Sequence, residues 1–205
     1  MRRWSGILGI AVFIVMGGAP AAVPAAQEGP RPGADIPAPE DCTVEPRPLG
    51  YFEDLAGQAI GTPEPPPADD ATPADAATVE AVTETIRLSL ACANAGDLAR
   101  YAALHTAAGL LSHFVDAPAD ALTQLPAVAA APPAPLPEEQ RNALYTVREV
   151  ATLPDDRVLV LADIYDPSAT PSDVTYAFIL IETDGQWLID DIRDAAPETD
   201  ATPTP

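Results

Sequence analysis

The stretch ALYTVREVATLPDDRVLVLADIYDPSATPSDVTYAFILIETDGQWLIDDIRD, residues 143–194, decides the fold. It holds four runs of β-branched, aromatic and aliphatic residues, and turn-forming residues separate each run from the next. Asp184-Gly185 is the strongest hairpin signal in the chain, because glycine accepts the positive φ that a tight hairpin turn requires. The stretch therefore predicts four consecutive antiparallel strands, over residues 143–153, 157–165, 174–183 and 187–193.

The second of these strands has an unusual composition. Its sequence RVLVLADIY is apolar at successive positions and does not alternate with polar residues. Such a strand is typically covered on both faces. We therefore expect a partner layer on each side of this part of the sheet.

Two helices are predicted before the sheet. Thr72 to Asp75 resemble a helix start, with a capping residue followed by proline. Residues 76–93 carry an apolar stripe at three- and four-residue steps, and Gly96 suits the left-handed end of a helix. Asp97 then caps a second helix that fades over residues 109–114. Residues 116–137, rich in alanine and proline, predict a loop with one helical turn.

The amino end has the chemistry of an exported protein. Residues 1–25 combine Arg2 and Arg3, a short apolar core and small residues near the expected cleavage site, which is typical of a secretory signal peptide. The alternative is a retained membrane anchor, but the apolar core of about 10 to 12 residues is shorter than the roughly 20 needed to span a bilayer. We expect a secreted, extracellular protein.

Between the signal and the helices, residues 26–71 are rich in proline and predict a linker. Residues 41–56 interrupt it with four apolar side chains and one cysteine, so we expect this arm to dock on the domain. The tail, residues 195–205, is predicted to be disordered. The remaining residues, 72–194, form the predicted single domain.

The chain has two cysteines, Cys42 in the arm and Cys92 in the first long helix. An even pair in an exported protein indicates a disulfide. Two free thiols or an intermolecular bridge are the alternatives. If the bridge forms, the arm belongs to the folded domain.

Charge restricts the partners. The chain has 10 basic residues, all arginine, against 31 acidic residues, and its net charge is −21. Binding to phosphates depends on basic side chains, so we expect no nucleic acid partner and no anionic membrane surface. The acidity itself indicates solubility rather than a particular activity.

The order of the elements predicts an α+β fold. The runs CANAGDLARYAAL, DDRVLVLADIY and DGQWLIDDIRD, in this order, resemble the nuclear transport factor 2-like superfamily, which includes the SnoaL-like and ketosteroid-isomerase-like groups. The resemblance covers residues 72–194. It implies a cone-shaped, curved antiparallel sheet of four main strands packed against the amino-terminal helices, with a pocket in the concave mouth and often a homodimer through the outer sheet face.

Candidate catalytic residues are few. His105, Asp163, Asp190 and Tyr101 are the side chains that a pocket acid or base would use in the isomerases and cyclases of that superfamily. Asp163 and Asp190 lie on apolar strand faces by alternation, although both have arginines nearby for ion pairs. His105 and His113 are eight residues apart, which does not fit a one-turn metal pair, so we expect no metal and no cofactor.

We expect a non-catalytic role, because no complete catalytic set is found. The alternative is a small pocket enzyme of the isomerase or cyclase type with a buried carboxylate or histidine as general acid or base. A binding domain would take a small apolar ligand, a protein partner or a second copy of the chain. A purely structural domain is the third option, and in that case the aromatic residues form only the core. The side chains expected around a ligand are Tyr101, His105, Tyr165, Tyr176, Phe178 and Trp187.

Overall fold

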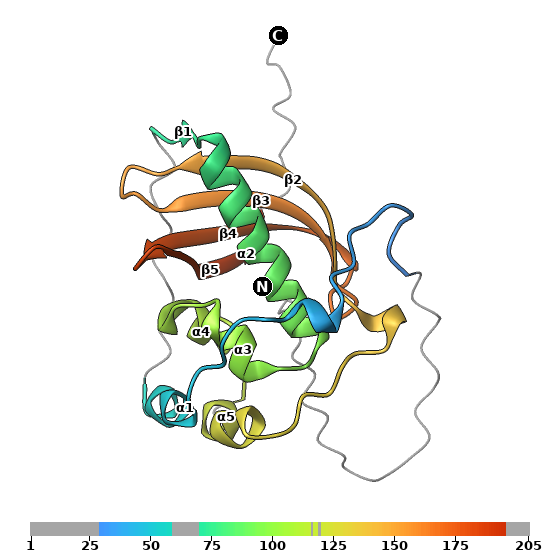
Figure 1. The fold of residues 1–205 in the computed structure, drawn as a ribbon, viewed down its shortest axis with the longest axis vertical. Coiled ribbons are helices and arrows are strands. Elements are labelled where there is room, and N and C mark those ends of the chain that lie inside the picture. The colour runs from blue at the N-terminus through green and yellow to red at the C-terminus, as the bar shows by residue number, and fades with distance from the viewer. Residues whose placement is uncertain (1–28, 59–69, 116, 119, 196–205) are drawn as a thin grey trace.

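The computed structural model describes residues 29–58, 70–115, 117, 118 and 120–195. Within these residues the chain is α+β, with one five-stranded antiparallel sheet and several helices (Figure 1). The predicted signal peptide (1–25), most of the second proline-rich tract and the tail beyond residue 195 lie outside the described residues.

The sheet has the strand order β1-β2-β3-β4-β5. Its four long strands confirm the predicted meander to within one or two residues at each end. A fifth, two-residue strand was not predicted. The strands are β1 (Thr72–Pro73), β2 (Ala143–Thr152), β3 (Val158–Tyr165), β4 (Asp173–Thr183) and β5 (Gln186–Asp194).

The described residues form five α-helices, of which α2 and α4 pack most closely on the strands. In Figure 1, α2 crosses the sheet, while α1, α3, α4 and α5 gather at one end of it. The helices are α1 (Leu49–Ala56), α2 (Ala76–Asn94), α3 (Leu98–Ala103), α4 (Ala107–Ser112) and α5 (Ala121–Ala129). Two 3-10 turns, η1 (Pro39–Asp41) and η2 (Glu138–Gln140), complete the elements.

The start of α2 corrects one prediction. Asp75 is the residue that caps the helix, because its carboxylate accepts a hydrogen bond from the backbone N–H of Thr78 over 2.8 Å. Thr72 and Pro73 pair instead with Thr152 and Ala151 at the end of β2. The cap signal was therefore assigned three residues too early, because the Thr-Pro pair belongs to an edge strand.

The end of α2 is as predicted. Gly96 has φ +61°, the N–H of Gly96 bonds to the carbonyl of Ala93, and the N–H of Asp97 bonds to the carbonyl of Cys92. These two bonds are the pattern that closes a helix through a left-handed glycine. A methyl group on Gly96 would lie 2.3 Å from the carbonyl oxygen of Ala134, so this turn requires glycine on steric grounds as well.

The core lies between the helices and one face of the sheet. On β3 it includes Val160, Ala162 and Ile164, all fully buried. On the opposite face of the same strand Leu159 and Leu161 are half-buried. The expectation that this strand is covered on both faces therefore holds for one face only.

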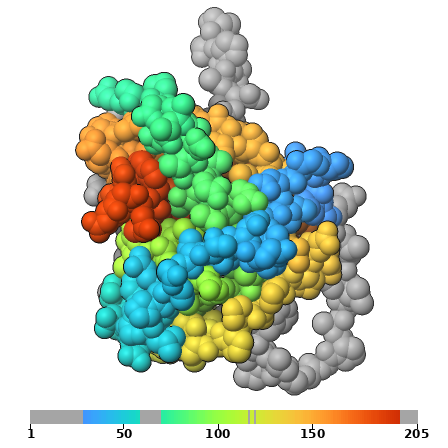
Figure 2. Space-filling model, in the orientation of Figure 1, coloured from blue at the N-terminus to red at the C-terminus, as the bar shows by residue number. Residues whose placement is uncertain are grey.

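The predicted amino-terminal arm packs against the domain. Phe52 and Leu55 of α1 are fully buried, and Cys42 forms a disulfide with Cys92. Figure 2 shows the segment from residue 29 to α1 lying across the front of the molecule, beside α2. The bridge confirms the predicted cysteine pairing.

The linker prediction for residues 26–40 is wrong for the part that is described. Asp35 and Leu144 exchange two backbone hydrogen bonds of 2.9 and 2.8 Å, and Arg31 forms an ion pair with Asp173. Main-chain pairing to β2 thus holds a segment whose composition suggested a tether. In the segment 116–137, α5 is a nine-residue helix with Leu122 and Leu125 buried, which is longer than the single turn predicted.

Candidate functional site

The candidate site begins where the predicted second helix breaks. α3 ends at Ala103, and the chain runs beside β5 before α4 starts. The N–H of Thr106 donates to the carbonyl of Ile189 over 3.0 Å, and the N–H of Ile189 donates to the carbonyl of Leu104 over 2.8 Å. This single parallel bridge fixes the backbone of His105 against the sheet.

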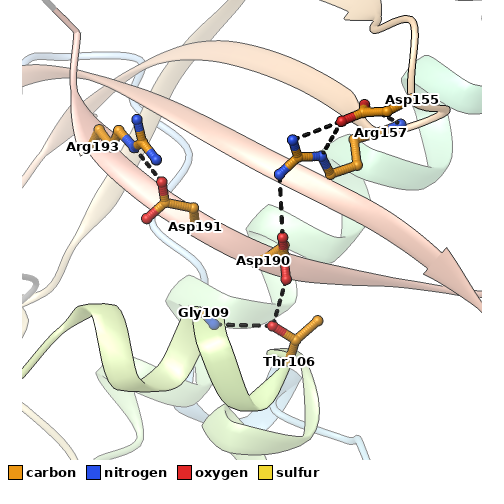
Figure 3. A network of polar contacts seen from close by, with 7 residues as sticks. All are labelled: Thr106, Gly109, Asp155, Arg157, Asp190, Asp191 and Arg193. Carbon is orange, nitrogen blue, oxygen red and sulfur yellow. Dashed lines mark hydrogen bonds and ion pairs between the residues drawn. The ribbon is translucent and has the colours of Figure 1, made fainter. Parts of the chain in front are cut away.

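A polar network holds the break in place (Figure 3). Thr106 caps α4, because its hydroxyl accepts a hydrogen bond from the N–H of Gly109. The same hydroxyl donates to the carboxylate of Asp190 over 2.8 Å. The other oxygen of Asp190 lies 3.5 Å from a guanidinium nitrogen of Arg157, which also binds Asp155. The carboxylate of Asp190 therefore holds Thr106, the residue that follows His105, in place.

Gly109 brings α4 close to the strand. A methyl group on this glycine would lie 2.3 Å from the carbonyl oxygen of Ile189. Only a residue without a side chain permits this approach of the helix backbone to β5. The site thus depends on a contact between main chains.

His105 is the central residue of the site. Its side chain is fully buried, and its Nδ1 lies 2.8 Å from the carbonyl oxygen of Tyr101. A carbonyl oxygen only accepts, so Nδ1 carries the proton and Nε2 of the neutral ring has a free lone pair. Nε2 is buried, and no described residue donates a hydrogen bond to it.

Three rings form what we call the ring cluster: Tyr101, His105 and His113. The rings of Tyr101 and His105 have centroids 4.2 Å apart, and those of His105 and His113 are 5.5 Å apart. The hydroxyl of Tyr101 lies 3.2 Å from Nε2 of His113. Two polar groups of the cluster therefore satisfy each other, whereas His105 keeps one unused acceptor.

Burial makes both histidines weak bases. Loss of solvent lowers the pKa of His105 to about 3, with a further contribution from His113, although the bond to the Tyr101 carbonyl opposes the shift. Loss of solvent likewise lowers the pKa of His113 to about 4. Burial raises the pKa of the Tyr101 hydroxyl above its ordinary value. The three rings are therefore uncharged at neutral pH.

A second buried polar pair lies on the sheet side. The hydroxyl of Tyr176 donates to the carboxylate of Asp166 over 2.8 Å, and both residues are about 1% exposed. The other oxygen of Asp166 accepts from the backbone N–H and the hydroxyl of Ser168. Burial, followed by the charge of Asp166, raises the pKa of Tyr176. The carboxylate is thus compensated by hydrogen bonds rather than by a cation.

The structure brings together only some of the predicted ligand residues. Tyr101 and His105 are in ring contact, and Tyr176 and Phe178 face the same core from β4. Trp187 is half-buried at the edge of that core. Tyr165 is also buried, but it lies on the opposite face of β3. Ala162 pairs with Tyr176 on the core face, whereas Tyr165, three residues further along the strand, pairs with Asp173 on the other face.

Of the candidate carboxylates, Asp163 lies away from the ring cluster. It is on the half-buried face of β3, where Arg148 and the hydroxyl of Thr175 each bind it over 2.7 Å. Asp190 is the extra residue of a β-bulge, since the partners of β4 step from Asp191 to Ile189. Strict alternation along β5 would place Asp191 on the face of Ile189, whereas the bulge pairs them with Ile179 and Leu180, on opposite faces of β4. Both candidates are held by arginine.

The role of His113 could not be read from its spacing. Eight residues on one straight helix would separate two side chains by about 12 Å along the axis. The break between α3 and α4 folds the chain back and brings the rings to 5.5 Å. The sequence signal for this break was Thr106 three residues before Gly109, a capping pattern inside an apparent helix.

Chemically, the arrangement offers one neutral hydrogen-bond acceptor within aromatic surroundings. A base with a pKa of about 3 is a poor proton acceptor at neutral pH, which argues against general base catalysis by His105. Among the described residues no group of three or more histidine, cysteine or acidic side chains could hold a metal ion. None of the described helices has the length and hydropathy of a membrane span.

Comparison with known proteins adds no relative. No family model, no curated protein and no solved structure matches the chain.

Proposed function

We propose that this chain is a secreted, non-catalytic domain that binds a small, largely apolar ligand beside the ring cluster. The observation that carries the proposal is the buried Nε2 of His105, which has no donor among the described residues. An unpaired buried acceptor costs free energy, typically about 1–3 kcal/mol. A ligand that supplies the missing donor would recover that free energy on binding.

The surroundings of His105 support an apolar ligand. The ring of Tyr101 lies 4.2 Å from that of His105, Ile189 is bridged to the His105 backbone, and both neighbours are almost fully buried. Binding sites for small molecules are typically apolar with a few placed polar groups. One acceptor among aromatic side chains fits this pattern.

The proposal includes the fold family and the location. Nuclear transport factor 2-like domains bind ligands between a curved sheet and helices, and the bulges in β2 and β5 would bend the strands in that sense. The disulfide between Cys42 and Cys92 is suited to an oxidising compartment outside the cell. The bridge agrees with export through residues 1–25.

Catalysis is the less favoured function. Asp163 and Asp190 are occupied by arginines, and His105 is too weak a base at neutral pH. An isomerase of this type needs a carboxylate or histidine that is poised to accept a proton. Binding requires no such group.

Native mass spectrometry of the protein purified from its own host tests the proposal. We expect a small molecule that stays bound in the native spectrum and is lost on unfolding. His105→Leu should reduce the ligand-bound fraction, whereas Asp163→Asn, a change on the other sheet face, should not. A spectrum of unliganded protein only, together with no binding of added naphthalene, would refute the proposal.

A further inference from the structure

We infer that the ligand presents an uncharged hydroxyl or N–H donor to Nε2 of His105, so that the site selects alcohols, phenols or indole-like compounds over their ethers, ketones and acids. This inference rests on the proposed function and specifies the polar group of its ligand. Three features of the described residues lead to it.

The first feature is the fixed state of the imidazole. The bond between Nδ1 of His105 and the carbonyl of Tyr101 places the only ring proton on Nδ1. The same carbonyl also accepts from the backbone N–H of Leu104. The carbonyl therefore orients the imidazole but would stay hydrogen-bonded without it. Nε2 therefore remains an acceptor, and a ligand oxygen without a hydrogen would meet a lone pair with a lone pair.

The second feature is that two other polar pairs near His105 are already hydrogen-bonded. The Tyr101 hydroxyl is bonded to Nε2 of His113 over 3.2 Å. The hydroxyl of Tyr176 is bonded to Asp166 over 2.8 Å. A carbonyl or ether ligand would find no free donor in these pairs, whereas a hydroxyl ligand finds a free acceptor at His105.

The third feature is the absence of a counter-charge in contact with the cluster. The chain has no lysine and a net charge of −21. Each ion pair identified among the described residues joins an arginine to an aspartate, and none of these pairs involves a residue of the ring cluster. A carboxylate ligand would therefore be buried without a cation, and burial of an unpaired charge is strongly unfavourable. An ammonium ligand would find near the cluster the carboxylate of Asp166, but Tyr176 and Ser168 already bond both of its oxygens.

Matched naphthalene probes test the inference. Calorimetric titration with 2-naphthol, 2-methoxynaphthalene, 2-naphthoate and 2-naphthylmethylammonium compares a donor with its methylated form and with both charges. We expect 2-naphthol to bind roughly tenfold or more tightly than the ether, because only the ether leaves the acceptor unpaired. The two charged probes should bind more weakly than 2-naphthol.

Variants locate the effect at His105. His105→Leu should bring the affinity ratio of 2-naphthol to its ether close to one while naphthalene still binds. Asp163→Asn should leave the ratio unchanged. In nitrogen-15 spectra of the histidine rings, 2-naphthol should shift the resonance of His105 Nε2, and the ether should not.

The outcomes separate the two proposals. Equal binding of 2-naphthol and its ether, or tighter binding of a charged probe, would overturn the donor inference and leave ligand binding intact. If none of the probes binds, including naphthalene, both proposals fail, and a buried water alone satisfies Nε2. Retention of the ratio in His105→Leu would also overturn the inference, because the donor would then be recognised elsewhere.

Discussion

Nδ1 of His105 lies 2.8 Å from the carbonyl oxygen of Tyr101, one helical turn earlier in the chain. This bond leaves the second ring nitrogen of a fully buried histidine as an acceptor that no described residue uses. The pair defines the orientation of the ring and leaves Nε2 as its acceptor nitrogen. The predictions below follow from this arrangement and from the contacts that hold it.

His105 should contribute little to stability. In His105→Leu the carbonyl of Tyr101 keeps the N–H of Leu104 as a donor, and the change removes an unpaired buried acceptor. We therefore expect the free energy of unfolding at pH 7 to change by about 1 kcal/mol or less. Urea denaturation measures this, with Ile86→Ala as a positive control that should lose about 2–5 kcal/mol. A loss of 3 kcal/mol or more in His105→Leu would indicate a structural histidine.

Stability should fall in mild acid. The pKa of His105 is about 3 in the folded protein and near the ordinary value of 6.5 in the unfolded chain. The unfolded chain therefore takes up the proton first, so this contribution is complete above pH 6.5 and is lost progressively between pH 6.5 and about 3. At pH 5 the loss from this residue is about 2 kcal/mol.

Urea denaturation at pH 5, 6 and 7 tests the acid dependence. His105→Leu should flatten the decline between pH 7 and pH 5 by about 2 kcal/mol relative to the original protein. His113, whose pKa is lowered to about 4, should produce part of the remaining slope. Parallel curves for the two proteins would mean that His105 titrates normally when folded.

Two glycines in helices should respond in opposite ways to alanine. In Gly109→Ala the new methyl group would lie 2.3 Å from the carbonyl oxygen of Ile189, so we expect a loss of about 1–3 kcal/mol. In Gly50→Ala nothing lies within 4 Å of the new group, and the helix should gain up to about 1 kcal/mol. Thermal unfolding compares the two variants. Equal effects would contradict the close approach of α4 to β5.

The disulfide should supply a large share of stability. Cys42 and Cys92 are 50 residues apart, and closing a loop of this length is worth about 4 kcal/mol in the chain-entropy model. Changing both cysteines to serine should lower the free energy of unfolding by about that amount. Hydrogen exchange should show that the amides of α1 lose protection first. Unchanged stability would mean that the arm docks independently of the bridge.

The strands could be predicted from sequence because each has a local cause. Alternating or continuous apolar runs and the Asp184-Gly185 turn placed the four long strands within one or two residues. The end of α2 was equally local, since Gly96 and Asp97 carry the signal. β1 could not be found in this way, because a two-residue strand has no pattern of its own.

The site depended on contacts that are remote in sequence. The break after α3 is held by Thr106 and Asp190, which are 84 residues apart. Asp190 itself lies in a bulge, which interrupts the alternation of faces along β5. His105 was a candidate by residue type, but its contact with His113 requires the folded turn. Tertiary packing, rather than helical spacing, brings the rings together.

The protonation state of the His105 ring tests the central claim most directly. Nitrogen-15 correlation spectra of the histidine side chains at pH 7 distinguish a protonated from an unprotonated ring nitrogen, and His105→Leu assigns the signals. We predict a neutral ring with the proton on Nδ1 and none on Nε2. A proton on Nε2, or a charged ring at pH 7, would contradict the account.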